Sequence, residues 1–280
     1  SEAIQLLGNN EGAKLIAGGH SLLPMMKLRL AQPDMLIDIA GIEELRGISV
    51  ENGTLRIGAL TTHAEIAESH IVKDNAGILW EAAYGIGDPQ VRNRGTIGGN
   101  VSHADPASDL PTVLTVMDAK FTIQGQGGIT RRGSRTVSAE EFFIGPFTTS
   151  LAENEILTSI DMPVLTENQK AEYAKMAHPA TAFALVGAGV VVTVDHHNCT
   201  AARVVVGGFT PVPTRGPSVE AALVGKELTA DNIAEATALI DGDLGSDVFG
   251  DVFASAEYRR AMAAIELKHA IFHATDLAHH

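Results

Sequence analysis

The chain has 280 residues, of which 45% are hydrophobic and 19% charged, a balance typical of a folded globular protein with two or three compact domains. Its 34 acidic residues outnumber the 20 basic ones and give a formal charge of −14, which argues against binding to nucleic acid or to an anionic membrane surface, because both need a basic surface. Cys199 is the single cysteine, so this chain alone can hold neither a disulfide framework nor an iron–sulfur cluster.

The first 60 residues have the pattern of a small α/β subdomain. The sequence opens in a helical pattern at 1–7, and we expect a few residues to be missing before it. Four short strands are expected at 13–17, 35–39, 48–50 and 54–57. The last two form a hairpin, because an Asn-Gly turn separates them. We therefore predict a first subdomain over residues 1–60.

Residues 61–168 are expected to form a second subdomain with more helix. Thr62 and Ser138 each stand three residues before a glutamate, which is the spacing of a capping box at a helix start. Further helices are predicted over 76–84 and from Ser108 onward, where Pro111 fits the first turn.

Residues 169–280 are expected to form a C-terminal domain of strands followed by helices. Two strands are predicted at 183–194 and 201–209, and the apolar run inside the first is too short to cross a bilayer. The last helix is predicted over 254–275. Its apolar Tyr258, Met262, Ile265 and Phe272 lie near one face, while Glu257, Arg260 and Lys268 can face water.

Near matches to catalytic and metal-binding motifs each lack a required residue. His269 and His273, for example, have the spacing of a zinc-binding pair, but Ala270 stands where a metalloprotease needs glutamate. We therefore predict no catalytic residue and no metal site in this chain. With no signal peptide in the sequence, we expect a cytoplasmic protein.

Two glycine-rich segments indicate a binding site. Residues 17–24 form the first loop, in which a Gly-Gly pair precedes Ser21, and residues 94–100 form the second, in which Thr96 precedes another pair. Glycine lets successive backbone N–H groups turn toward one anion, and the two hydroxyl groups can add donors. A hydrogen bond to a charged group contributes about 1.5–3 kcal/mol. The residues alone therefore predict a diphosphate site for a nucleotide cofactor.

The same segments resemble a known family, the FAD-binding medium subunits of the carbon monoxide dehydrogenase and xanthine dehydrogenase (molybdenum hydroxylase) family. The segment 17–24, with Lys27-Leu28-Arg29 after it, resembles the first flavin loop of that family, and 90–100 resembles the second, continued by Ser108-Asp109-Leu110-Pro111. The segment 255–260 is similar to a helix motif of the family's C-terminal domain. The matches occur in the same order and span nearly the whole chain.

The resemblance implies an α+β fold in which two flavin-binding subdomains hold FAD and a C-terminal domain pairs a small antiparallel sheet with helices. It also implies an oxidoreductase subunit that carries electrons. Iron–sulfur clusters of the [2Fe-2S] type would lie on a small subunit and the molybdenum cofactor on a large subunit. FAD on this chain would pass the electrons to an external acceptor, within a dimer of heterotrimers.

The resemblance also implies individual cofactor contacts. The residues expected to bind FAD are Ala17, Gly18, Gly19, His20, Ser21, Leu22, Leu23, Ile86, Thr96, Ile97, Gly98, Gly99, Asn100, Asp109, Leu157 and Lys175. The chain departs from many relatives at His178 and Ala182, where those carry a basic residue and an aspartate.

Two other functions stay open on the sequence. A free-standing FAD-dependent oxidase or reductase would need its own substrate pocket, and His20 and His103 are the only candidate bases near the loops. A non-catalytic nucleotide-binding module would bind its ligand without reversible reduction.

Overall fold

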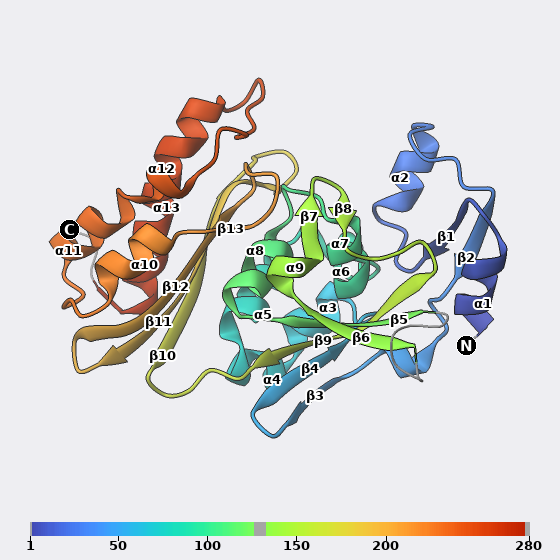
Figure 1. The fold of residues 1–280 in the computed structure, drawn as a ribbon, viewed down its shortest axis with the longest axis horizontal. Helices are drawn as coiled ribbons and strands as arrows, with labels where there is room; N and C mark the ends of the chain where they lie inside the picture. Colours follow the sequence, from blue (N-terminus) through green and yellow to red (C-terminus); the bar gives the residue numbers. More distant parts are fainter. Residues whose placement is uncertain (1, 126–132, 278–280) are drawn as a thin grey trace.

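The computed structural model describes residues 2–125 and 133–277, which form three modules in sequence order (Figure 1). Within these residues, a small N-terminal module lies at one end, a five-stranded sheet with its helices lies in the middle, and a four-stranded sheet with helices α10 to α13 lies at the other end. Each module contains its own cluster of buried apolar side chains.

The N-terminal module is a β-α-β unit. Strands β1 (Ala13–Ile16) and β2 (Met35–Asp38) pair in parallel, and α2 (Leu22–Lys27) lies in the connection between them. Helix α1 (Glu2–Asn9) buries its apolar side chains against this pair. The helix and both strands expected here are confirmed. Because ligands of parallel α/β units bind beyond the carboxyl ends of the strands, the loop that follows β1 lies in a favourable place for a site.

The central sheet is antiparallel throughout, in the order β3-β4-β9-β5-β6. Its strands are β3 (Ile48–Glu51), β4 (Thr54–Gly58), β5 (Lys120–Gly125), β6 (Ser134–Ser138) and β9 (Glu155–Pro163). The hairpin expected at 48–57 is confirmed as β3 and β4, and β4 pairs with β9, about a hundred residues away in the sequence. The sheet therefore takes strands from both sides of residue 60.

Short helices surround this sheet and connect its strands. They are α3 (His63–Glu68), α4 (His70–Asn75), α5 (Gly77–Tyr84), α6 (Pro89–Arg92), α7 (Ile97–His103), α8 (Asp109–Val116) and α9 (Ala139–Phe142). A small hairpin of β7 (Phe143–Gly145) and β8 (Thr148–Thr149) follows α9. Both expected capping boxes are confirmed, because Thr62 and Ser138 each exchange hydrogen bonds with the glutamate three residues later.

The C-terminal domain is a four-stranded antiparallel sheet covered by helices. Its elements are β10 (Gln169–Ala177), β11 (Ala184–Asp195), β12 (Asn198–Gly207), β13 (Thr214–Arg215), α10 (Pro217–Leu223), α11 (Ala230–Thr237), α12 (Ile240–Asp243) and α13 (Ala256–Ala274). Helix α13 packs on β10 and β11, while α8 of the central module packs on β11 and β12. A Cβ atom at Gly207 would lie 2.1 Å from the hydroxyl of Thr112 on α8, so a side chain there would displace Thr112 where the two modules meet.

The long last helix is confirmed, but the expected buried face of α13 is wrong in part. Phe272 is buried, whereas Tyr258 and Ile265 are exposed. Arg259 and Glu266 are buried in their place. The guanidinium of Arg259 donates to Asp251 and to the carbonyl oxygen of Ala254, so these partners offset the cost of burying its charge.

The mixture of helices and mainly antiparallel sheets confirms the expected α+β class. No helix in the described ranges 2–125 and 133–277 is both long enough and apolar enough to span a bilayer.

Candidate cofactor site

The first glycine loop connects β1 to α2. Gly19 has φ +75°, a left-handed conformation that favours glycine, and the ring of His20 lies 3.0 Å from the carbonyl oxygen of Gly18 through its Nδ1 atom. The Ser21 hydroxyl makes no capping bond to α2. Across the described parts of the chain, the backbone N–H groups of residues 18–21 have no hydrogen-bond acceptor. Four consecutive donors are thus available to an anion.

The second loop has a different arrangement. The hydroxyl of Thr96 caps α7 by accepting a hydrogen bond from the Gly99 N–H group. Ile97 and Gly98 donate to the carbonyl oxygens of Thr61 and Ala59, and the N–H group of Asn100 donates to Thr96. These four amides already have acceptors, so within the described chain the second loop can offer a diphosphate only the amide of Thr96, and most of the available donors come from the first loop.

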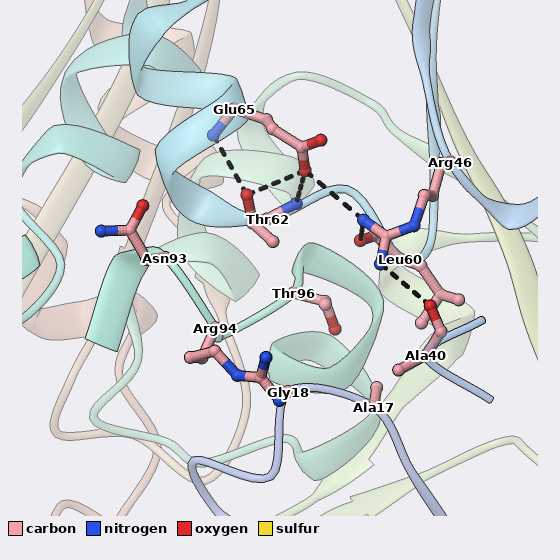
Figure 2. Close-up of a pocket in the computed structure, with 10 residues that line it drawn as sticks. All are labelled: Ala17, Gly18, Ala40, Arg46, Leu60, Thr62, Glu65, Asn93, Arg94 and Thr96. Carbon is pink, nitrogen blue, oxygen red and sulfur yellow. Dashed lines mark hydrogen bonds and ion pairs between the residues drawn. The ribbon is translucent and has the colours of Figure 1, made fainter. Parts of the chain in front are cut away.

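The two loops touch. A Cβ atom at Gly18 would lie only 1.9 Å from the carbonyl oxygen of Arg94, so the chains of both loops approach as closely as glycine allows. They also line one cavity of about 300 Å³. Figure 2 shows the cavity walls; the residues that line it are Ala17, Gly18, Ala40, Arg46, Leu60, Thr62, Glu65, Asn93, Arg94 and Thr96. Segments that lie some 75 residues apart in the sequence thus meet at one site.

Charged groups line one side of this cavity. The guanidinium of Arg46 donates to the carbonyl oxygen of Ala40 at 2.9 Å and lies 3.9 Å from the carboxylate of Glu65 (Figure 2). The same carboxylate accepts hydrogen bonds from the backbone and hydroxyl of Thr62. These contacts tie the segment after β2 to the start of α3, and so hold the walls of the cavity together.

A second cluster of candidate residues surrounds Asp109, the first residue of α8. Asp109 is 4% exposed, and its carboxylate accepts hydrogen bonds from the Tyr173 hydroxyl at 2.7 Å and from Lys175 Nζ at 2.9 Å. Burial raises the pKa of Asp109 above its ordinary value, and the charge of Lys175 opposes that rise. Burial likewise raises the pKa of Tyr173, and the neighbouring Asp109 carboxylate raises it further. The carboxylate is therefore held by a cation and a neutral phenol.

Hydrogen bonds connect the two clusters. The Ser108 hydroxyl donates to the side-chain oxygen of Asn100 at 2.7 Å, so the last residue of the second loop is joined to the residue before Asp109. Lys175 also donates to the carbonyl oxygens of Gly85 and Ala182, each at 3.0 Å. The predicted site residues from 17 to 23, from 96 to 100, and at 109 and 175 thus form a continuous set.

The two apolar site candidates differ in their surroundings. Ile86 follows α5 in a turn beside Lys175 and is half-buried against the central core. Leu157 lies on β9, is buried, and belongs to that same core. Nothing in these contacts separates a cofactor-binding role for Leu157 from ordinary packing, so its role stays a prediction.

Neither histidine considered as a base has the surroundings of one. His20 is exposed, and His103 packs against the ring of Phe147, with ring centres 5.2 Å apart. Burial lowers the pKa of His103. In neither case does a carboxylate of the described chain orient the ring by a hydrogen bond, as the base of a nucleophilic site would require.

Three residues without a predicted role, Tyr173, His63 and Arg46, lie at the candidate site. Tyr173 shares a strand face with Lys175, and the two-residue period of a strand could have revealed this pairing. His63 is buried against Gly95, and its backbone N–H donates to the Gly95 carbonyl at 2.9 Å. Burial lowers the pKa of His63 to about 4, with smaller effects of His20 and Arg92. No local pattern marks His63 or Arg46, because their contacts are long-range.

Comparison with known proteins agrees with this geometry. Residues 1–165 match the family model described as the FAD binding domain in molybdopterin dehydrogenase, and residues 171–274 match the CO dehydrogenase flavoprotein C-terminal domain. The chain is 39% identical to the carbon monoxide dehydrogenase medium chain of Hydrogenophaga pseudoflava, over 96% of this chain and 92% of that one.

Two further relatives carry names with other substrates. The chain is 35% identical to the glyceraldehyde dehydrogenase medium chain of Sulfolobus acidocaldarius, with 94% of this chain and 91% of that one covered. In the crystal structure of quinoline 2-oxidoreductase from Pseudomonas putida 86, one chain superimposes with a TM-score of 0.92 at 30% identity, covering 98% of this chain and 93% of that one. The resemblance seen in the sequence and the expected two-subdomain flavin fold are both confirmed: this chain belongs to the family of FAD-binding subunits of the molybdenum hydroxylases.

Proposed function

We propose that this chain binds FAD across its two glycine loops and carries electrons from iron–sulfur clusters of a small subunit to an external acceptor. The molybdenum cofactor would lie on a large subunit. FAD supplies the reversible redox chemistry when bound, and the protein supplies its position and electrostatic surroundings. The family membership supports this role, as does Cys199 being the single cysteine, which leaves the metal centres to partner chains.

One observation carries the cofactor assignment. The four N–H groups of residues 18–21 lack acceptors in the described chain, and Gly18, the first of them, stands directly against the second loop. An array of backbone donors without bulky side chains suits a diphosphate, and each bond to the charged oxygens contributes about 1.5–3 kcal/mol. No lysine is required, which agrees with the acidic composition of the chain.

The other proposed contacts with FAD come from the two glycine loops and from the cluster around Asp109. We propose that residues 17–23 and 96–100 hold the diphosphate region, and that Asp109, Lys175 and Ile86 face the flavin ring, with Leu157 completing the apolar wall. Asp109 and Lys175 neutralise each other at 2.9 Å. Because Lys175 already uses its three donors within the chain, the pair can hold a flavin N–H group only through the Asp109 carboxylate, and it adds no net charge.

The wider assembly is also a proposal. We infer a cytoplasmic dimer of heterotrimers, with two FAD-binding subdomains in residues 1–60 and 61–168 that share the central sheet through β3 and β4, and a C-terminal domain in residues 169–280. Carbon monoxide dehydrogenase and glyceraldehyde dehydrogenase relatives are named as medium chains, which supports the existence of larger and smaller partners. Because those names carry different substrates, we place substrate choice on the large subunit.

Titration of the purified chain with FAD and with FMN tests the site. FAD should bind and develop a resolved visible flavin spectrum, whereas FMN should bind much more weakly because it lacks the diphosphate. Equal affinity for both would contradict the role of the first loop.

Rapid reduction of the bound flavin by a small organic molecule, without partners, would favour a free-standing oxidase or reductase. Binding of FAD without reversible reduction would favour a nucleotide-binding module. Co-purification with an iron–sulfur and a molybdenum protein supports the assembly.

A further inference from the structure

The turn formed by Gly85, Ile86 and Gly87 is fixed by two cations. Lys175 Nζ donates to the carbonyl oxygen of Gly85 at 3.0 Å. The Nη1 atom of Arg92 lies 3.0 Å from the carbonyl oxygen of Ile86 and 3.3 Å from that of Gly87. Three successive carbonyl groups therefore point at positive charge, and the side chain between the two glycines is held in one place.

Arg92 differs from Lys175 in its charge balance. Lys175 forms an ion pair with Asp109, whereas no carboxylate in the described part of the chain pairs with Arg92. Its guanidinium is partly buried and lies 5.4 Å from the ring centre of Tyr84, a cation–π contact. Arg92 therefore brings one positive charge without a carboxylate partner in the described chain to this end of the site.

We propose that Arg92 is a positioning residue for the flavin, which fixes the Gly85–Gly87 turn so that Ile86 contacts the cofactor and which leaves a net positive charge beside it. This inference rests on the proposed function, because Ile86 is assigned there to the flavin ring. Two of its properties can be separated: the Nη1 donor group that holds two carbonyl groups, and the charge.

The two properties have different consequences. Loss of the donors leaves two carbonyl groups without partners in a turn that has glycine on both sides, so the turn loosens and FAD affinity falls. Loss of the charge shifts the flavin midpoint potential to a more negative value, because a nearby cation stabilises the negative charge that reduction brings to the flavin. Lysine keeps the charge but lacks the planar guanidinium, which binds the turn through Nη1 while it lies over the ring of Tyr84, whereas glutamine keeps an amide donor but is neutral.

The test uses the purified full chain with the variants Arg92→Lys and Arg92→Gln. Arg56→Gln is the matched control, because Arg56 is exposed and pairs with Asp161 on the central sheet. We would measure the Kd for FAD by fluorescence titration, the flavin midpoint potential by spectroelectrochemistry, and the melting of the chain without FAD. Arg92→Lys should weaken FAD binding about 10-fold with little change in potential, and Arg92→Gln should weaken binding and also lower the potential. The control should change neither.

Some results would overturn the inference. If wild type binds FAD and both Arg92 variants match it in Kd and potential, Arg92 has no positioning role, although the proposed function stands. If wild type does not bind FAD, the proposed function fails instead. Should Arg92→Gln melt well below wild type, Arg92→Lys alone decides: weaker binding at an unchanged potential supports the role, and a wild-type Kd refutes it.

Discussion

Replacing Gly18 with alanine tests the contact between the two glycine loops. The new Cβ atom would lie 1.9 Å from the carbonyl oxygen of Arg94 and 3.0 Å from the Cα atom of Gly95. Ordinary contact begins at 3.4 Å, so the backbone of one loop must move by about 1.5 Å. Both neighbours are backbone atoms, and no side chain can rotate away to relieve the clash.

The expected loss follows from the cost of overpacking. Inserting one methyl group into a closely packed contact costs about 1–3 kcal/mol, and every 1.4 kcal/mol in binding is a factor of ten. If the free chain relieves the clash by separating the loops and the complex with FAD brings them together again, the cost falls on binding and the Kd should rise roughly 5- to 150-fold. Gly41→Ala is the matched control, because Gly41 lies in the same module and a Cβ there meets no atom within 4 Å.

The assay combines an FAD titration with thermal melting of the chain before FAD is added. Gly18→Ala should bind FAD more weakly than Gly41→Ala while the melting temperature falls by at most a few degrees. If Gly18→Ala instead binds FAD with the wild-type Kd, the loops need not touch to form the site. If the Kd is unchanged and Gly18→Ala melts well below Gly41→Ala, Gly18 serves the fold alone.

Two pH-dependent predictions follow from the folded-state pKa values. Burial, and to a smaller extent Glu81, raises the pKa of Glu172 to about 8. Between about pH 4.5 and 8 the folded protein therefore keeps a proton on Glu172 that the unfolded chain has lost. The free energy of unfolding falls as the pH rises through this range. Glu172→Gln should melt higher than wild type at pH 8 and nearly the same at pH 4, and an equal difference at both values would contradict the raised pKa. The pKa of Asp251 is lowered to about 2 by hydrogen bonds from the backbone N–H groups of Ala254 and Phe253 and from the side chain of Arg259. The contribution of Asp251 to the free energy of unfolding is present above about pH 4 and is lost as the pH falls toward 2. Asp251→Asn should therefore melt below wild type at pH 6, with the gap closing near pH 2.5, and a gap independent of pH would argue against ionic contacts of Asp251.

Local features of the fold were predictable because the sequence itself encodes them. The Asn-Gly turn determines the hairpin at 48–57, and the Thr62 and Ser138 capping boxes form because each donor and acceptor lies within one turn of helix. The strands β1 and β2 are short apolar runs bounded by turns. None of these depends on distant residues.

Long-range features were not predictable in the same way. The pairing of β4 with β9 depends on packing between segments about a hundred residues apart, and no single-segment pattern records it. On α13 the rule that apolar side chains face inward fails at Arg259, because buried carbonyl oxygens and Asp251 provide partners for its guanidinium. Partners of this kind lie outside the helix, so helical periodicity does not reveal them.

The two glycine pairs also show why similar motifs can have different physical origins. In the second loop a Cβ atom at Gly98 would lie 2.6 Å from both the Cβ and the carbonyl oxygen of Ala59, and the Gly98 amide donates to that same carbonyl. Glycine is needed there so that α7 can begin directly against the end of β4. In the first loop the amides of residues 18–21 have no acceptor in the described chain. A substitution at Gly98 would therefore lower FAD affinity by displacing α7. A substitution that forces Gly19 out of its left-handed conformation would instead turn away backbone donors to the phosphates.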